Sequence, residues 1–331
     1  MNVFIEPGFN KYYSQYPLVL IDVGASGGLQ PNWFPARKYL QMIGFEPDER
    51  EFHNFESGGN SNVKYLNAGL YSERTTVDYY LTEKQQASSM LKPNEKFLQK
   101  FPESQRFKIV GKKVIKTDTL DNLFDHHKIN DVDFIKLDTQ GSELYILEGA
   151  HQTIRNHVFG LEIEMAFSQI YENQPLFSDV DSFVRKQGFQ LFDIQRNYWK
   201  RNEGINRHKK KGQLIFANVL YLRDAEDFYE IVQKIGPVDI RKGKVLKALS
   251  ICFLYGYFDY ASEIFNKANV LFASEEQSSV AKKIESSTHL GNKIPNFKGR
   301  RKIANMVHSL WEILQPTHNS WATADGKLGN V

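Results

Sequence analysis

The sequence predicts an α/β fold, in which a mostly parallel sheet is flanked by helices, followed by an α-helical region. Three observations support this fold class. An apolar run that starts at Leu18 ends in Asp22 and passes directly into a turn of small residues, Gly24 to Gly28, which is typical of a buried parallel strand that ends at a ligand. Strand-like and helix-like stretches then alternate up to about Asp224, as in a doubly wound sheet. Beyond that residue only helical periodicity remains.

The predicted elements are assigned in chain order from apolar, β-branched runs and from helical spacing. After the first strand, the expected strands are Met42–Glu46, Val63–Leu66, Thr75–Leu81, Val114–Lys116, Val132–Leu137, Val158–Met165, Phe189–Ile194 and Gln213–Leu222. The expected helices are Pro31–Leu40, one that starts at Pro47–Asp48, Thr119–His127, Gly141–Asn156 and Phe177–Gly188. A basic loop, and no helix, joins the last two strands, so we expect them to pair antiparallel.

Composition limits the function classes. The 331 residues are 41% hydrophobic and 24% charged, which is an ordinary globular balance. A net charge of +3 is too small to indicate nucleic-acid binding by itself. One cysteine, Cys252, excludes an intramolecular disulfide. The N-terminus has no continuous apolar segment of a secretory signal, and no apolar run approaches the roughly 20 residues that span a bilayer. We therefore expect a cytoplasmic protein without a transmembrane segment.

The glycine turn between two acidic strand ends is a nucleoside-binding geometry. Glycine allows backbone N–H groups to approach a ligand closely, and Glu46, at the end of the second strand, can accept both hydroxyls of a ribose. A dinucleotide and S-adenosylmethionine both fit this description. The turn lacks the second glycine of the dinucleotide fingerprint, and Asp22 would repel a pyrophosphate but attract the ammonium and sulfonium of S-adenosylmethionine. The sequence favours S-adenosylmethionine, with an NAD-dependent oxidoreductase as the alternative.

Several ordered motifs carry a more specific resemblance. The stretches IDVGASGG, IGFEPD, NAGLYS and IKLDTQGSELYILEGA, with later ones to about Asp224, resemble the FkbM family of S-adenosylmethionine-dependent methyltransferases. This resemblance implies a class I methyltransferase fold, a Rossmann-like seven-stranded sheet with an antiparallel last strand. The implied reaction is O-methylation of a hydroxyl on a sugar, glycan or secondary metabolite.

The same resemblance implies a set of cofactor-binding residues. They are Asp22, Gly24, Ala25, Ser26, Gly27, Glu46, Asn67, Ala68, Asp138 and Gln140. By motif position, the turn would line the methionine and ribose portion with Asp22 supporting it, and Glu46 would hold the ribose hydroxyls. Asn67 and Ala68 would border the adenine, and Asp138 and Gln140, after the strand Val132–Leu137, would face donor and acceptor.

Acidic side chains near this edge are candidates for catalysis. Asp138 is our first candidate for the general base that a hydroxyl acceptor needs, because it ends a central strand on the ligand side. The alternatives are that it caps the next helix or binds the donor's ammonium. Glu162 and Glu164 share one strand face: Glu162 could bind an acceptor hydroxyl, and Glu164 is a weaker candidate base. With Asp138 they could also hold a divalent cation, but we expect no metal, because no histidine is placed beside them.

Two loops carry candidate acceptor contacts. Ser88 and Ser89 follow the edge strand in a polar loop, where the family usually has serines near its site. The loop 196–212 holds seven lysines and arginines against one acid, Glu203. It contains the candidate residues Tyr198, Trp199, Arg207 and Lys209. We expect either a lid that attracts an anionic acceptor, such as an acidic or phosphate-linked glycan, or a mobile solvated loop.

The predicted organisation is a methyltransferase domain over 1–224, an α-helical domain over 225–315 and a flexible tail over 316–331. Within the helical part, Leu246–Tyr255 and the helix after Gly256 resemble a tetratricopeptide-like pair. One such pair cannot bury its own faces. The C-terminal helices should therefore pack on the first domain, on a second subunit in a homodimer, or on a protein partner. A non-catalytic binding protein that uses these helices is the other alternative function.

Overall fold

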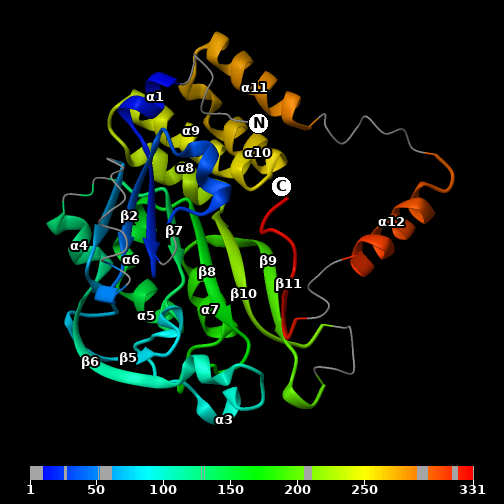
Figure 1. Ribbon diagram of the computed structural model, residues 1–331. Coiled ribbons are helices and arrows are strands. Elements are labelled where there is room, and N and C mark those ends of the chain that lie inside the picture. The colour runs from blue at the N-terminus through cyan, green and yellow to red at the C-terminus, as the bar shows by residue number, and fades with distance from the viewer. Residues whose placement is uncertain are drawn as a thin grey trace.

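The computed structural model describes residues 10–25, 28–50, 52, 62–127, 129, 131–204, 211–288, 297–314 and 320–330. Within them, an eight-stranded sheet has the order β11-β9-β10-β8-β7-β1-β2-β3 (Figure 1). The strands are β1 (Leu18–Val23), β2 (Leu40–Phe45), β3 (Val63–Leu66), β7 (Phe134–Leu137), β8 (Gly160–Ala166), β9 (Phe189–Trp199), β10 (Gln213–Arg223) and β11 (Ala322–Ala324).

The strand directions confirm the predicted α/β class. β3, β2, β1, β7 and β8 run parallel to one another, whereas β10 is antiparallel to both β8 and β9. The antiparallel pairing expected for the last two strands is therefore confirmed. The carboxyl ends of β1, β2, β3, β7 and β8 meet at one edge of the sheet, where parallel sheets bind ligands.

Helices cover both faces of the sheet. On one face lie α4 (Leu120–His126), α5 (Glu143–Glu148), α6 (His151–His157) and α7 (Phe177–Lys186). On the other lie α1 (Asn10–Gln15), the 3-10 helix η2 (Pro31–Ala36), α8 (Ala225–Lys234), α9 (Val238–Leu254), α10 (Phe258–Ala268) and α11 (Ser274–Thr288). Successive side chains of each strand point to opposite faces of the sheet. Ile21 and Ile135 pack with the first group of helices, and Leu20 and Phe134 pack with the second.

The C-terminal helices are part of this sandwich. Phe228 of α8, Val245 of α9 and Ile264 of α10 belong to the same hydrophobic cluster as strand residues of β1, β7 and β10. The boundary predicted near Asp224 thus separates two kinds of secondary structure, while one hydrophobic core runs across it. Helical periodicity shows that a helix has an apolar face, but not which surface covers that face, and so the sequence left the partner of these helices open.

Buried ion pairs fasten α9 to the sheet. The Lys244 ammonium lies 2.6 Å from Asp131 and 2.8 Å from Asp133, and the Lys247 ammonium lies 2.7 Å and 2.9 Å from the same carboxylates. Both lysine side chains are almost completely buried. Asp133 also accepts a hydrogen bond of 2.9 Å from the backbone N–H of Val19 in β1. The cluster therefore joins the helix to the amino ends of two central strands.

A smaller sheet lies beyond the carboxyl edge of the main one, at the lower end of the molecule in Figure 1. It has the order β4-β6-β5, formed by β4 (Gly69–Leu70), β6 (Ile109–Asp118) and β5 (Thr75–Thr82). The short elements η3 (Gln85–Ala87), α3 (Glu95–Leu98) and η4 (Ser104–Phe107) connect its strands. β6 is longer than the predicted strand Val114–Lys116 because it pairs along the whole of β5.

The end of the chain differs from the expected flexible tail. Ala322–Ala324 form β11, which pairs antiparallel with Asn197–Trp199 of β9. The Trp321 ring lies 5.4 Å from that of Trp199. The Asp325 carboxylate lies 2.6 Å from the side chains of both Arg196 and Lys211. These contacts hold the terminal segment on the edge strand and satisfy its backbone.

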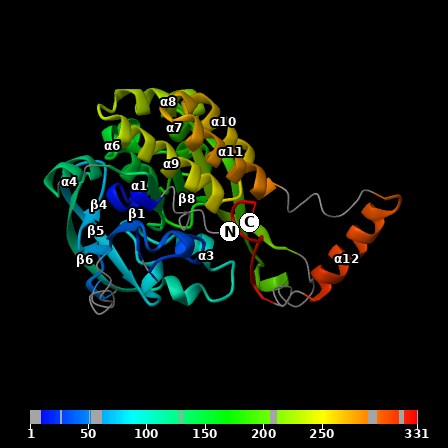
Figure 2. The same cartoon turned by 90° about the horizontal axis from the view of Figure 1, so that it is seen from above.

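The remaining elements are the 3-10 helices η5 (Asn202–Gly204) and η6 (Asn269–Leu271) and the helix α12 (Arg300–Leu314). α12 stands clear of the rest of the fold in both views (Figures 1 and 2). In the described part of the chain, none of the helices has both the length and the apolar character that crossing a membrane would require.

Candidate active site

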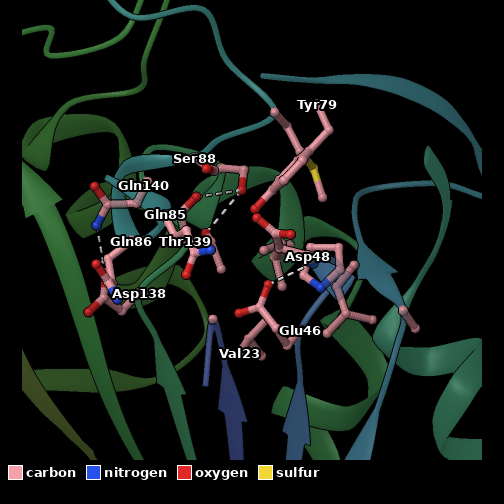
Figure 3. Close-up of a pocket in the computed structure, with 17 residues that line it drawn as sticks. Val23, Glu46, Asp48, Tyr79, Gln85, Gln86, Ser88, Asp138, Thr139 and Gln140 are labelled. Atoms are coloured by element: carbon pink, nitrogen blue, oxygen red, sulfur yellow. Dashed lines mark hydrogen bonds between the residues drawn. The ribbon is translucent and has the colours of Figure 1, made fainter. Parts of the chain in front are cut away.

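A pocket opens at the carboxyl ends of β1, β2 and β7 and is roofed by the smaller sheet (Figure 3). Six residues proposed from the sequence line it: Gly24, Glu46, Ala68, Ser88, Asp138 and Gln140. Other lining residues include Tyr79, Gln85, Gln86 and Met90 from β5 and the chain that follows it. The topology therefore brings together segments that are far apart in sequence, as a parallel sheet does at its carboxyl edge.

The turn after β1 is possible only with glycine at position 24. Gly24 has φ = +76°, and a Cβ atom there would lie 1.9 Å from the backbone oxygen of Asp138. Its N–H donates a hydrogen bond of 3.0 Å to the carbonyl of Phe45. The turn is thus packed between the ends of β2 and β7, and its backbone faces the pocket. The neighbouring Ser26 and Gly27 lie outside the described residues, and Ala25 is buried.

Asp22 and Glu162 lie below the pocket and do not line it. Asp22 is aligned with Lys136 of β7, which is aligned with Glu162 of β8. The Lys136 ammonium is 3.1 Å from the Asp22 carboxylate, and the Tyr255 hydroxyl at the end of α9 donates a hydrogen bond of 2.8 Å to Glu162. Burial raises the pKa of both carboxyls, and Lys136 opposes that effect. The expected acceptor contact of Glu162 is therefore replaced by a contact with α9, because that helix covers this sheet face.

The carboxyl end of β2 provides a second group of acids. Glu46 is buried, and its carboxylate accepts a hydrogen bond of 2.8 Å from the N–H of Asp48. Asn67 donates to the backbone oxygen of Glu46 at 3.0 Å and so supports it from β3. Asp48 forms an ion pair of 2.5 Å with Arg50, which donates in turn to the Ser88 hydroxyl at 3.2 Å. This contact connects the main sheet to the roof.

Gln140 organises the acids at the end of β7. Its amide nitrogen donates to Asp138 at 2.9 Å and to Glu164 at 3.1 Å. Its amide oxygen accepts a hydrogen bond of 3.0 Å from the Tyr171 hydroxyl, and its backbone oxygen accepts one of 2.8 Å from Ser89. Gln140 has φ = +59°, a left-handed conformation that is uncommon outside glycine and marks a constrained position.

The two acids held by Gln140 differ in environment. Both side chains are half-buried, but Asp138 lines the pocket and Glu164 is not among its lining residues. Burial, the nearby Asp138 and Glu143 raise the pKa of Glu164 well above its ordinary value. The Gln140 amide fixes the position of Glu164 beside Asp138. Of the two candidate bases, only Asp138 faces the pocket.

Glu143 is a supporting residue that the sequence reasoning missed. It lies in the first turn of α5, and one carboxylate oxygen accepts hydrogen bonds from the N–H and hydroxyl of Thr139 and from the N–H of Gly141. Burial raises its pKa to about 7. Its signal in the sequence was an acid in the first turn of a helix after a glycine. Apart from Ser88, the roof residues had no comparable signal, because non-local pairing of β5 and β6 brings them here.

The aromatic acceptor contacts expected in the loop 196–212 lie elsewhere. Trp199 is buried in a cluster with Phe101 and Phe107, at ring distances of 5.5 Å and 6.0 Å, because β9 extends past its predicted end and pairs with β11. Tyr198 is also buried and receives the Lys211 ammonium at 4.7 Å from its ring centre. Neither is among the described pocket-lining residues. Arg207 and Lys209 lie outside the described residues.

Chemically, the arrangement offers a polar cleft with carboxylates from two strand ends and a bare backbone turn between them. Among the described residues, no group of three or more histidine, cysteine, aspartate or glutamate side chains is arranged to hold a metal ion. The site can therefore bind a polar ligand with hydroxyl or cationic groups through carboxylates and amides.

Comparisons with known proteins identify the region. A family model described as a methyltransferase FkbM domain matches residues 22–191. No curated protein matches the chain. Among solved structures, a methyltransferase FkbM from Methylobacillus flagellatus KT is 17% identical with a TM-score of 0.37, and the alignment covers 64% of this chain and 47% of that one. This chain thus spans about half the length of that relative.

Two further solved structures are similar at lower identity. Magnesium protoporphyrin IX methyltransferase from Synechocystis PCC 6803, solved with bound S-adenosylmethionine, is 10% identical with a TM-score of 0.32, over 66% of this chain and 76% of that one. The N-terminal domain of EvdMO1, solved with bound S-adenosylhomocysteine, is 9% identical with a TM-score of 0.31, over 65% of this chain and 78% of that one.

Proposed function

The chain belongs to the FkbM family of methyltransferases, and on this premise we propose that it transfers a methyl group from S-adenosylmethionine to a hydroxyl oxygen of a sugar or a similar polar small molecule. The single observation that carries the proposal is the convergence of Gly24, Glu46 and Asp138 in one pocket at the carboxyl edge of the sheet. The solved neighbours with bound donor or product are consistent with this donor.

The donor's parts correspond to different walls of the pocket. Glu46, at the end of β2, and Ala68, after β3, both line the pocket; in the proposed complex Glu46 accepts the ribose hydroxyls and Ala68 borders the base. The bare backbone of Gly24 permits close approach of the methionine portion. Asp22 does not contact the donor in this proposal; its ion pair with Lys136 holds the carboxyl ends of β1 and β7 together beneath the pocket. The pocket's carboxylates favour a cationic donor over a pyrophosphate.

Asp138 is the group that we assign as general base. In the reaction, a new bond forms between the acceptor oxygen and the methyl carbon, while the carbon–sulfur bond breaks and its electron pair stays on sulfur. The hydroxyl proton passes to the Asp138 carboxylate. The Gln140 amide orients that carboxylate at 2.9 Å, and the raised pKa of Glu164 favours the uncharged form of this neighbouring carboxyl. Positioning of this kind supplies much of the acceleration in an in-line displacement.

The roof of the pocket favours a polar acceptor. Gln85, Gln86 and Ser88 supply amide and hydroxyl groups there, next to the phenol of Tyr79. Such groups match the alternating donors and acceptors of a polyhydroxy compound. Attraction of an anionic acceptor by the basic loop is a weaker part of the proposal, because Arg196 and Lys211 are ion-paired with Asp325.

Calorimetric titration with S-adenosylmethionine and with NAD tests the donor. We expect binding of the former only, and weakening of about ten- to a hundredfold in Glu46→Gln, because charge-assisted hydrogen bonds are lost. Binding of NAD alone would overturn the assignment in favour of an oxidoreductase.

Release of S-adenosylhomocysteine with a panel of sugars and glycans, with and without acidic groups, tests the acceptor. In Asp138→Asn, turnover should fall by about 10²–10⁴-fold, while donor affinity stays within a few fold. The matched carboxyl-to-amide control is Asp78→Asn on the half-exposed side of β5, which should leave turnover unchanged. Wild-type turnover in Asp138→Asn would reject its role as base, and methylation at nitrogen would reject the O-directed reaction.

A further inference from the structure

α12 is an amphipathic helix whose apolar face is uncovered. Its apolar residues recur at helical spacing and form one continuous stripe: Ile303, Met306, Val307, Leu310, Trp311 and Leu314. Each of these side chains is between 52% and 71% exposed. In both views, the helix lies away from the body of the protein (Figures 1 and 2). Solvent exposure of a full-length apolar stripe is unfavourable, so a surface that covers the stripe would stabilise the helix.

The charges of α12 lie at an unusual end. Arg300, Arg301 and Lys302 occupy its first turn, which has no acidic residue, and its last turn has no basic one. Lys298 precedes them and is also exposed. The helix dipole favours the opposite distribution, with anions at the N-terminus and cations at the C-terminus. The dipole of the helix therefore disfavours this cationic group, whereas an external anionic surface would stabilise it.

From these two features we propose that α12 docks on the surface of an anionic lipid bilayer. A bilayer interface supplies in one object both the apolar layer for the stripe and the negative headgroups for the cations. The aromatic ring of Trp311 suits the boundary between headgroups and acyl chains. At 15 residues the helix is about 22 Å long, too short to span the hydrocarbon layer, so it lies in the plane of the interface.

A second copy of the chain is the competing occupant of this face. Charge disfavours it: α12 carries three cations in its first turn and a single acidic residue, Glu312. Two such helices side by side in parallel would bring like charges together. An antiparallel pair would set each basic turn against a C-terminal end with one acid. The charge balance therefore points to a strongly anionic surface and away from another α12.

Co-sedimentation of the full chain with vesicles tests the proposal. The probes are vesicles of phosphatidylcholine alone and vesicles of equal parts phosphatidylcholine and phosphatidylglycerol. We expect binding only to the mixed vesicles, and release of the protein when salt is added, because counterions screen the headgroups. Equal binding to both vesicles, or binding to neither, would overturn the proposal.

Two variants separate the apolar and the electrostatic parts. Leu310→Glu places a charge in the stripe and should weaken binding by at least about tenfold, since an apolar contact is lost and a charge is buried. The double variant Arg301→Gln with Lys302→Gln should weaken binding by about 25-fold, at about fivefold for each cation near an anionic surface.

Matched controls make the same changes elsewhere on the surface. Val270→Glu alters an apolar side chain that is 75% exposed, and Lys96→Gln with Lys282→Gln removes the same charge from exposed positions on α3 and α11. Both control variants should bind the mixed vesicles as tightly as the wild type. If they weaken binding as much as the α12 variants do, the total charge of the protein determines binding, and the assignment to α12 would fail. A different outcome would assign the apolar face of α12 to a second copy of the chain. In that outcome the wild type is a dimer that does not bind vesicles, and Leu310→Glu is a monomer. Calorimetric binding of S-adenosylmethionine, measured on the same samples, reports on the proposed methyl transfer independently.

Discussion

Replacing Gly24 by alanine tests the packing at the centre of the site. The new Cβ atom would lie 1.9 Å from the backbone oxygen and 2.8 Å from the backbone carbon of Asp138, and main-chain atoms cannot rotate away as a side chain can. A left-handed φ costs a non-glycine residue about 1–2 kcal/mol, and forced backbone displacement adds about 1–3 kcal/mol. Gly24→Ala should therefore lower the free energy of unfolding by about 2–5 kcal/mol, measured by urea denaturation.

Gly28 offers a matched control in the same turn. It has φ = +75°, but an added Cβ there would meet nothing within 4 Å. Gly28→Ala should therefore cost only the backbone part, about 1–2 kcal/mol. Equal losses in the two variants would refute the argument that close approach to Asp138 dictates the glycine.

The same substitution should affect the donor. From the sequence alone, Gly24→Val is expected to block donor binding in a folded protein. The structure adds that any side chain at position 24 must push the end of β7, and so displaces Asp138 as well. Calorimetry should show loss of S-adenosylmethionine binding in Gly24→Ala and near wild-type affinity in Gly28→Ala. Wild-type affinity in Gly24→Ala would mean that the turn does not face the donor.

Two further predictions concern buried charges. Lys244→Met removes one cation from the pair of carboxylates, Asp131 and Asp133, and should destabilise the protein by about 3–5 kcal/mol in urea; a loss below about 1 kcal/mol would show that this cluster does not hold α9 to the sheet. Burial raises the pKa of Glu143 from an ordinary 4.5 to about 7, so the native state binds a proton that the unfolded state has released. The contribution of this group to the free energy of unfolding should fall by about 3 kcal/mol in total as pH rises from about 4.5 to 7. Glu143→Gln should lack that pH dependence. Parallel profiles of unfolding free energy against pH in wild type and variant would contradict the raised pKa.

Six site residues proposed from the sequence line one pocket, and their positions could be predicted because the information there is local. In a parallel sheet each strand end faces the same edge, so Asp138 and Glu46 could be assigned to one site from their positions after apolar runs alone. The tight turn at position 24 was equally predictable from its glycine, since few other residues adopt a left-handed backbone conformation. The residues that shape the roof, such as Gln86, depend on pairing between strands far apart in sequence, which no local pattern encodes.

Other differences have the same origin. Trp199 was predicted as an acceptor contact in a basic loop, but this part of the loop forms a strand that pairs with Ala322–Ala324, and the ring is buried. Lysines in a helix are ordinarily solvated, so nothing in the sequence indicated that Lys244 and Lys247 are buried. Their ion pairs with Asp133 and Asp131 beside the sheet explain the burial. Glu162 was correctly assigned to a strand, and its partner Tyr255 became visible only when α9 was placed on the sheet.

The contribution of the C-terminal helices to the core has a consequence for synthesis on the ribosome. Strands β1 to β10 emerge first, yet one of their faces, including Leu20 and Phe134, is covered by α8–α10. Translation proceeds at about 5–20 residues per second, so the nascent sheet carries an open apolar face for several seconds before those helices appear. β9 gains its neighbour β11 only after α8 to α12 have been synthesised. The protein should therefore rely on chaperones during elongation more than a methyltransferase whose sheet is covered by preceding helices.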